Sequence, residues 1–324
     1  MTDQQKTRML TGLQPSGDLH IGNYFGSIKP FLDTLEKEQF SPESAFLMVA
    51  DYHALTSQKD ADILRKDIYN IVRAYLACGV DPEKVVLFRQ SDNQDHMELA
   101  WILNCMVSVP FLMQAHAYKD KVQKGIDANV GLFTYPMLMA ADIALYNTTL
   151  VPVGEDQRQH LEYTREAVSK LNATFAEDLL VAPKEKIIKD VGVVPGIDGQ
   201  KMSKSYKNTI PLFATEEETE KAVMRIVTDS EGDFPENVYN IHRLIKSEDE
   251  LKTLYEDCSG RYGELKKQLA TDLNEYLLKI RKVYTETTDE QILEVLDKGV
   301  KQAKVVSNQT LRRVRDAIGI NLNK

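Results

Sequence analysis

Two hydrophobic patterns divide the chain near residue 210. Before this point, short unbroken apolar runs such as 44–50 and 85–88 alternate with stretches whose apolar residues recur at helical spacing, such as 63–78. Apolar runs of this length are typical of strands that are buried on both faces of a parallel sheet. Strands and helices that alternate in this way predict an α/β fold built on a doubly wound parallel sheet.

The pattern after Pro211 is helical throughout. Three capping boxes, in which Ser or Thr is followed three residues later by Glu or Gln, open helical stretches at Thr215, Ser247 and Thr288. A leucine-rich stripe at helical spacing runs over 265–280, and no apolar run typical of a buried strand follows it. We therefore expect a C-terminal α-helical domain over 211–324 and an α/β domain over 1–210.

A glycine-rich turn over 12–17 joins the first predicted strand to the first predicted helix, which Asp18 is expected to cap. Such a turn directs free N–H groups and a positive dipole end to one place, which suits a phosphate. His20 and Asn23 are three residues apart, so both side chains project from one face of the helix as neutral donors. An ordinary strand–turn–helix with one surface histidine is the alternative, and the turn alone supports both about equally.

Polar side chains also follow two later strands. Asp51 and His53 come directly after the run 44–50, and Glu155 and Asp156 follow a strand predicted at 150–153. Ligands of doubly wound sheets bind beyond the carboxyl ends of the strands, and acidic side chains there accept hydrogen bonds from ribose hydroxyls. The alternatives, helix caps and a satisfied buried histidine, have comparable support.

One face of a helix that we expect to begin near Pro136 carries Tyr135, Met139 and Asp142. Apolar residues flank Asp142, and a carboxylate in such surroundings needs a donor because its unpaired burial is costly. A structural ion pair or an exposed turn would also explain the acid. A tyrosine, a methionine and an acid on one face favour a pocket for a flat ring that carries an N–H.

Lys201 and Lys204 flank a glycine-rich loop over 193–205. Their spacing lets both ammonium groups serve one anion, such as the pyrophosphate that gains charge as the α–β bond of ATP breaks. An ordinary surface loop is the less probable alternative because five consecutive residues match a known signature.

Composition narrows the class of protein. The 324 residues are 43% hydrophobic and carry a net charge of −9, which argues against coating nucleic acid through bulk charge but not against a local basic surface. The N-terminus has no apolar stretch, so we expect a cytoplasmic protein without a membrane segment. The three cysteines match neither a disulfide framework nor a zinc pattern, so no structural metal is expected: Cys78, Cys105 and Cys258.

The motifs together resemble a known family. Lys201-Met-Ser-Lys-Ser205 and His20-Ile-Gly-Asn23 are similar to the two signatures of class I aminoacyl-tRNA synthetases, with Asn23 in place of the last histidine. Further motifs narrow the resemblance to the bacterial tryptophanyl-tRNA synthetase family, over nearly the whole chain: Gln14-Pro-Ser-Gly17, Asp51-Tyr-His53, Tyr135 to Asp142 and Val151 to Gln157.

This resemblance implies a Rossmann-type catalytic domain over 1–210 and a helical anticodon-binding domain over 211–324. It implies a homodimer, with an inserted segment of about 92–134 at the interface. Within this segment, an apolar run over 105–113 is broken by Pro110. The run is either an exposed apolar patch used for dimerisation or part of the internal core. The implied substrates are L-tryptophan, ATP with Mg²⁺, and tRNA(Trp), and the implied reaction is activation of tryptophan followed by its transfer to the tRNA.

The resemblance also assigns roles to individual residues. It implies catalytic roles for His20, Asn23, Lys201 and Lys204. The implied ATP-binding residues are Gln14, Pro15, Ser16, Gly22, Asn23, Gly154, Glu155, Asp156, Val193, Lys201, Met202, Ser203, Lys204 and Ser205. The implied tryptophan-binding residues are Asp142, Tyr135, Met139, His53, Gln157 and Val153.

Three rival functions remain. A tyrosyl-tRNA synthetase shares the fold and also directs an acid at its ring substituent. A nucleotidyltransferase for a small metabolite would use the same turn but would not need the helical half. A non-catalytic RNA-binding paralogue is disfavoured because His20, Lys201, Lys204 and Asp142 are all present.

Overall fold

A parallel sheet forms the centre of the molecule. The computed structural model describes residues 7–38, 40–115, 118–119, 123, 128–153, 158–187, 194–228 and 234–322. Their strands form a five-stranded sheet in the order β3-β2-β1-β4-β5, with every neighbouring pair parallel. This order is that of the Rossmann-type fold, so the predicted fold class is confirmed. The strands are β1 (Met9–Leu13), β2 (Ala45–Val49), β3 (Val86–Arg89), β4 (Leu150–Val153) and β5 (Lys184–Ile187).

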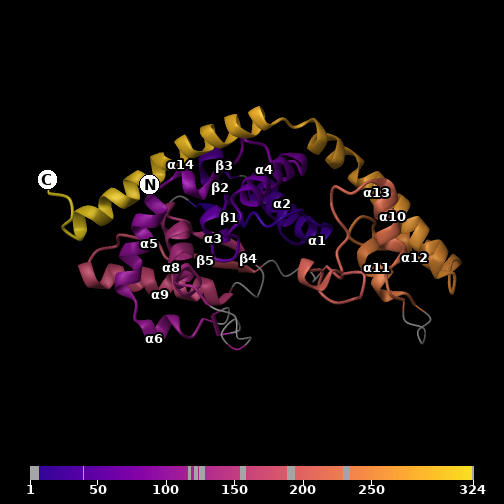
Figure 1. Cartoon of the computed structure of the whole chain (residues 1–324), viewed down its shortest axis with the longest axis horizontal. Coiled ribbons are helices and arrows are strands. Elements are labelled where there is room, and N and C mark those ends of the chain that lie inside the picture. Colours follow the sequence, from indigo (N-terminus) through magenta and orange to yellow (C-terminus); the bar gives the residue numbers. More distant parts are fainter. Residues whose placement is uncertain are drawn as a thin grey trace.

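Helices cover both faces of the sheet, and a second group of helices lies at one end of the molecule (Figure 1). None of the described helices is long and apolar enough to span a membrane. In the sheet-bearing part they are α1 (Ile21–Asn23), a π-helical turn (Tyr24–Ile28), α2 (Lys29–Glu38), α3 (Asp51–Ala54), α4 (Ala61–Ala77), α5 (Asp95–Met106), α6 (Val109–Leu112), α8 (Val130–Leu145) and α9 (Arg158–Phe175). The rest are α10 (Glu216–Met224), α11 (Glu236–His242), α12 (Glu248–Asp257), α13 (Tyr262–Glu286) and α14 (Asp289–Ala317), with 3₁₀ turns at Pro42–Ser44, Gln90–Asp92 and Lys204–Tyr206.

The residues of β2 explain why its sequence is an unbroken apolar run. Side chains of a strand point alternately to its two faces. Ala45, Leu47 and Val49 belong to the hydrophobic cluster that also contains α4, whereas Phe46 and Met48 belong to the cluster that contains α5 and α8. Both faces are therefore buried, and each position of the strand has to be apolar.

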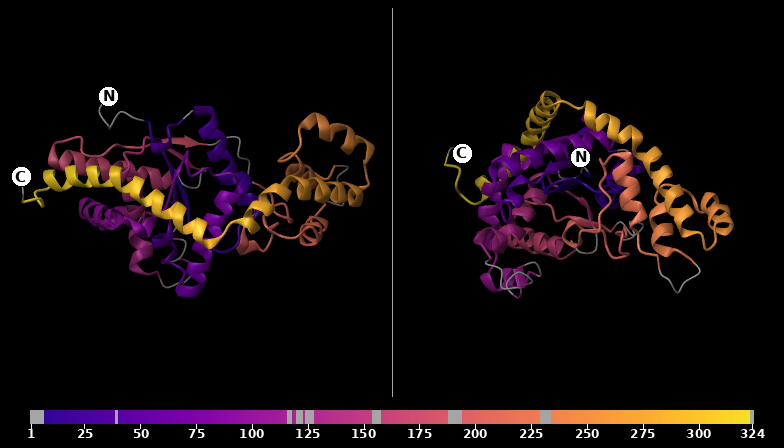
Figure 2. Two further views of the ribbon diagram at one scale, coloured as in Figure 1. Left: turned by 90° about the horizontal axis from the view of Figure 1, so that it is seen from above. Right: turned by 45° about the vertical axis from the view of Figure 1, so that its right-hand side comes forward.

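The last helix, α14, returns from the helical group and runs along the sheet-bearing part (Figures 1 and 2). Ile292 packs in the cluster on one side of the sheet, whereas Ala303 and Val306 pack in the cluster on the other side. Between them, a Cβ atom on Gly299 would lie 1.8 Å from the carbonyl oxygen of Leu87 in β3. Only glycine permits this approach, and it lets α14 cover β3, a strand at the edge of the sheet.

The three predicted capping boxes are all present. The hydroxyl groups of Thr215, Ser247 and Thr288 each accept a hydrogen bond from the backbone N–H three residues later. The Glu or Gln at that later position accepts one in return from the backbone N–H of the cap. The helical nature of the segment after Pro211 thus follows from local sequence signals, while its role in anticodon binding stays a prediction.

Two helices begin at other residues than predicted. α8 begins at Val130 and not near Pro136, because Asn129 caps it and the apolar stretch that follows continues the helix through the proline. The first helix is capped by His20 rather than Asp18, and the His20 N–H donates to Asn23 Oδ1 at 3.0 Å. Asn23 therefore helps to shape the turn in which it was expected to act as a donor.

Candidate active site

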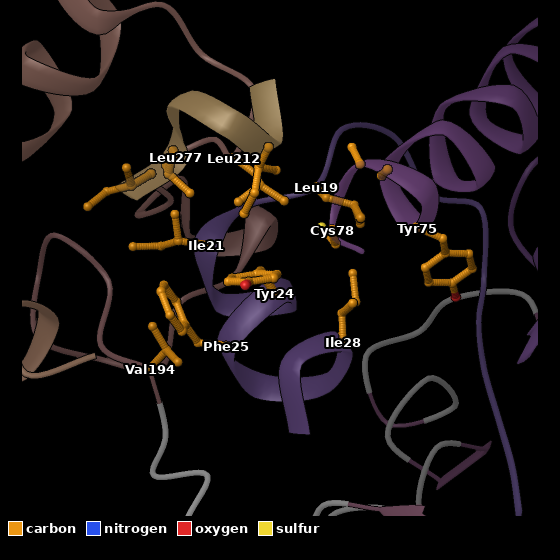
Figure 3. Close-up of a cluster of buried hydrophobic side chains, with 14 of the residues drawn as sticks. Leu19, Ile21, Tyr24, Phe25, Ile28, Tyr75, Cys78, Val194, Leu212 and Leu277 are labelled. Atoms are coloured by element: carbon orange, nitrogen blue, oxygen red, sulfur yellow. The ribbon is translucent and has the colours of Figure 1, made fainter. Parts of the chain in front are cut away.

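The start of the first helix, directly after the glycine-rich turn, pairs with the segment that follows the lysine loop. The N–H of Ile21 donates to the carbonyl of Ile210 at 3.0 Å, and the N–H of Leu212 donates to the carbonyl of Leu19 at 2.9 Å. Figure 3 shows the side chains of Leu212, Ile21 and Leu277 of α13 close together in one hydrophobic cluster. This packing holds the two predicted phosphate-binding segments side by side, although about 190 residues separate them.

The lysine loop lies directly on the first helical turn. A Cβ atom at Gly22 would be 2.8 Å from His20 Nδ1 and 3.2 Å from Met202 Cβ, so Gly22 leaves the space that the loop fills. The ammonium group of Lys204 donates to the carbonyl oxygen of Ser16. The structure thus brings the lysine loop and the helical turn that carries His20 into contact. Their proximity is what a shared anion site would require.

Asn208, which the sequence did not single out, braces the lysine loop. Its side-chain oxygen accepts from the N–H of Ser203 at 2.7 Å, and its amide group donates to Asp198 Oδ1 at 2.7 Å and to the carbonyl of Lys201 at 3.1 Å. The residue is buried, so these bonds are shielded from water. The spacing of residues in the sequence does not indicate this role, because the bonds form only once the loop has folded back on itself and no sequence motif predicts that fold.

His20 is buried, and its surroundings keep it neutral. Burial, together with the positive charge of Lys204, lowers the pKa of His20 to about 4. Its Nδ1 atom has no hydrogen-bond partner in the described part of the chain. A buried polar atom is costly to leave unpaired, so this nitrogen suits a hydrogen bond to a bound ligand. Burial also lowers the pKa of Lys204, although the negative charges of Asp18 and Asp67 act to raise it.

Asp142 lies in a second group of side chains, at the carboxyl ends of β2 and β3. The residue is 2% exposed. Its Oδ2 atom lies 2.9 Å from His53 Nε2, and its Oδ1 atom lies 2.7 Å from both Gln90 Nε2 and His96 Nδ1. The acid is thus buried and well supplied with donors, as a carboxylate in an apolar helix face requires.

These donors keep the carboxylate ionised. Burial by itself would raise the pKa of Asp142, but the hydrogen bonds from His53 and His96, together with the positive charge of these rings when they are protonated, outweigh it and lower the pKa to about 2. At neutral pH the side chain is therefore an acceptor only. Three of its roughly four lone-pair positions have partners among the described residues, which leaves capacity at Oδ2.

The structure also supplies neighbours that the sequence did not assign. Gln90 directly follows β3, and a polar residue at a strand end was the same signal that drew attention to Asp51. His96 lies on α5 and had no such signal. Tyr135 and Met139, the expected companions of Asp142, lie half-buried on the same helix, and the Tyr135 hydroxyl is hydrogen-bonded to His160 Nε2.

Of the other residues predicted to bind ATP or tryptophan, some are placed by the structure and some lie outside the described residues. Gln14 and Ser16 are exposed and Pro15 is buried directly after β1, and Ser205 follows in the short 3₁₀ turn of the lysine loop. Val153 ends β4, and only its backbone is described. The others lie outside the described residues: Gly154, Glu155, Asp156, Gln157 and Val193.

Known proteins that are similar to this chain belong to the family that these motifs indicate. Residues 2–279 match the family model for class I tRNA synthetases of the W and Y type. The chain is 41% identical over 323 residues to the tryptophan–tRNA ligase of Fusobacterium nucleatum, with 97% of this chain and 98% of that protein covered. The chain belongs to the tryptophanyl-tRNA synthetase family. The resemblance inferred from the motifs is thereby confirmed.

Solved structures of this family are similar along nearly the whole chain. The tryptophanyl-tRNA synthetase of Campylobacter jejuni, in complex with ADP and tryptophan, superimposes with a TM-score of 0.88 at 41% identity, covering 97% of this chain and 100% of that one. The enzyme of Mycoplasma pneumoniae superimposes with a TM-score of 0.84 at 29% identity, covering 97% and 98%. The architecture of the family therefore extends over both the sheet and the helical group.

Proposed function

We propose that this protein activates L-tryptophan with ATP and transfers it to the 3′ end of tRNA(Trp). The observation that carries the proposal is the buried, ionised carboxylate of Asp142, on the helix that also bears Tyr135 and Met139. Tryptophan offers a single ring N–H, and Oδ2 of Asp142 can accept it. A buried acceptor selects the substrate that pairs with it and rejects one that leaves it unpaired.

In the first step an oxygen of the tryptophan carboxylate attacks the α-phosphorus of ATP. The bond to the β-phosphate oxygen breaks, and the products are tryptophanyl-adenylate and pyrophosphate. No side-chain nucleophile is required. Lys201, Lys204, His20 and Asn23 serve the reaction by aligning the phosphates and by stabilising the charge that develops on the leaving pyrophosphate.

In the second step a ribose hydroxyl of the terminal adenosine of the tRNA attacks the carbonyl carbon of the adenylate. The ester to the tRNA forms, the bond to the phosphate breaks, and AMP leaves. The helical segment over 211–324 is proposed to bind the anticodon. Because α14 packs on the sheet, a chain that ends near residue 211 would also lose part of the cover of β3.

ATP is proposed to bind as its magnesium complex, with Mg²⁺ held by phosphate oxygens. The turn at the end of β1 and the lysine loop lie together, which supports a common phosphate site. The proposed ATP-binding residues are Gln14, Pro15, Ser16, Gly22, Asn23, Gly154, Glu155, Asp156, Val193, Lys201, Met202, Ser203, Lys204 and Ser205. Those proposed to surround tryptophan, besides Asp142, are Tyr135, Met139, His53, Gln157 and Val153.

A homodimer is proposed through the face formed by α5 and α6, which lies within the expected inserted segment. Four large apolar side chains of α5, of α6 and of the residue directly after α6 are strongly exposed: Met97 at 47%, Trp101 at 71%, Val109 at 60% and Met113 at 51%. Exposed apolar patches of this kind mark protein–protein contacts. A role in protein synthesis would place the enzyme in the cytoplasm.

Amino-acid-dependent ATP–pyrophosphate exchange with all twenty amino acids tests the proposal. We expect exchange with tryptophan and very little with tyrosine or phenylalanine, together with charging of tRNA(Trp). Exchange that prefers tyrosine would indicate the tyrosyl enzyme. Exchange without tRNA charging would indicate a nucleotidyltransferase, and no exchange with any amino acid would indicate a non-catalytic protein.

A further inference from the structure

A buried chain of hydrogen bonds leads away from Asp142 to the C-terminal helix. His96 binds Asp142 through Nδ1, and its Nε2 atom lies 2.8 Å from the hydroxyl of Tyr146. Asn93 donates to that hydroxyl at 3.1 Å and to Ser307 Oγ of α14 at 2.9 Å. His96, Tyr146, Asn93 and Ser307 are all fully buried. The chain therefore runs from the proposed tryptophan pocket to α14 without contact with solvent.

The direction of each bond follows from the chemistry of the groups. The ionised Asp142 can only accept, so His96 Nδ1 carries the proton. Nε2 of His96 is then free to accept a hydrogen bond, and the Tyr146 hydroxyl donates to it. Asn93 donates one of its two amide protons to Tyr146 and the other to Ser307. Every proton in the chain then has an acceptor. The hydroxyl of Ser307 completes the chain by donating to Asp95 Oδ2 at 2.6 Å.

The alternative, a protonated imidazolium, does not satisfy the chain. His96 would then donate from both ring nitrogens, and the Tyr146 hydroxyl would accept from His96 and from Asn93. Its own proton would have no acceptor among the described residues. A buried hydroxyl without an acceptor is costly, so the chain favours the neutral imidazole with its proton on Nδ1.

We infer that His96 is a positioning residue for Asp142 and that the hydrogen bonds from Tyr146 through Asn93 to Ser307 of α14 keep it neutral. This inference rests on the proposed role of Asp142 in tryptophan recognition. His96 and Gln90 occupy Oδ1, which fixes the carboxylate and leaves Oδ2 to accept the indole N–H beside His53. A neutral His96 also adds no positive charge beside Asp142, so the carboxylate stays a strong acceptor.

The test compares tryptophan with L-3-(3-benzothienyl)alanine, in which sulfur replaces the ring N–H. The measured quantity is the ratio of kcat/KM for the two substrates in ATP–pyrophosphate exchange. We expect His96→Leu to lower this ratio by about 10- to 100-fold, because a hydrogen bond to a charged group contributes in that range. His96→Asn should restore most of the ratio, since its amide can donate where Nδ1 does. A merely structural role would lower both rates and leave the ratio unchanged, which would overturn the inference.

Tyr146→Phe keeps the test decisive if His96→Leu fails to fold. It removes the hydroxyl that donates to His96 Nε2 and keeps the imidazole neutral, so we expect the ratio to fall in the same direction by several-fold, and an unchanged ratio would overturn the inference. His242→Leu is a matched control because His242 is also buried and bonded to an acid, Asp272 at 2.8 Å, but in the helical group. Its ratio should equal that of the wild type.

Asp142→Ala separates the failure of this inference from the failure of the proposed function. If Asp142→Ala retains the wild-type ratio, Asp142 does not recognise the indole N–H and the proposed function loses its main support. If the ratio falls in Asp142→Ala but keeps its wild-type value in His96→Leu and Tyr146→Phe, the proposed function stands and the positioning role of His96 is wrong.

Discussion

The ammonium group of Lys204 donates a hydrogen bond to the carbonyl oxygen of Ser16, which lies 188 positions earlier in the chain. Ser16 belongs to the turn at which phosphate binding is proposed, and Lys204 belongs to the loop proposed to stabilise the leaving pyrophosphate. A backbone carbonyl is a neutral acceptor, whereas a phosphate is an anionic and stronger one. ATP would therefore replace Ser16 as the partner of this lysine.

Lys204→Ala should slow adenylate formation and leave the affinity for tryptophan nearly unchanged. The lysine acts on charge that develops only in the transition state, so its loss should lower kcat by about 10²- to 10³-fold. Rapid-quench measurement of adenylate and equilibrium binding of tryptophan give the two quantities. Lys207→Ala, an exposed lysine of the same segment, serves as control. A main effect on tryptophan affinity would contradict this role.

His20 should make the protein less stable in mild acid. Its pKa is about 4 in the folded protein, against 6.5 for an ordinary histidine. Between these values the unfolded chain binds a proton that the folded protein does not, so the free energy of unfolding falls as the pH decreases. Between pH 7 and pH 5 the wild type should lose up to about 2 kcal/mol more than His20→Gln. Urea unfolding measures both, and equal losses would argue against a buried neutral His20.

Gly299→Ala should strongly destabilise the protein. The new Cβ atom would overlap the carbonyl oxygen of Leu87 and push α14 away from β3. Overpacking of this kind lowers the free energy of unfolding by about 3 kcal/mol or more. Gly263→Ala is the matched control, because among the described residues no atom beyond its own turn of α13 lies within 4 Å of its Cβ position, and alanine favours a helix. If the two variants had equal free energies of unfolding, α14 would not pack as closely against β3 as the structure indicates.

Trp101 is the only tryptophan of the chain and is 71% exposed on α5, so it reports directly on the proposed dimer. Trp101→Glu should raise the dissociation constant of the dimer by about 100-fold or more, because an unpaired charge would be buried in the interface. Sedimentation velocity over a range of concentrations measures this constant. Leu278→Glu, which replaces an exposed apolar residue of α13, should not change it. An unaltered dimer in Trp101→Glu would exclude this face as the interface.

Local signals made much of the fold predictable. The runs 44–50 and 85–88 predicted β2 and β3 to within a residue or two, because strands buried on both faces have to be apolar at every position. Capping boxes are equally local, since Thr215 and its partner Glu218 are only three residues apart. Proline was a weaker signal, because the interior of α8 accommodates Pro136.

Much of the site was not predictable because its contacts join distant parts of the chain. His53 and Asp142 were both named as candidates from their places after a strand and on a helix, but their pairing across 89 positions has no local signature. The bond between Asn93 and Ser307 spans 214 positions, and nothing in the spacing of either residue indicates it. His96 was missed for the same reason.

The central claim, that Asp142 selects tryptophan by accepting its indole N–H, is tested most directly by kcat/KM for tryptophan and phenylalanine in the wild type and in Asp142→Ala. The wild type should prefer tryptophan by a factor of about 10⁴, because phenylalanine leaves the buried acceptor unpaired. Asp142→Asn should keep part of this preference, since its amide oxygen can still accept. Asp142→Ala should lose most of the preference together with activity on tryptophan. An Asp142→Ala enzyme that still prefers tryptophan as strongly as the wild type would contradict the claim.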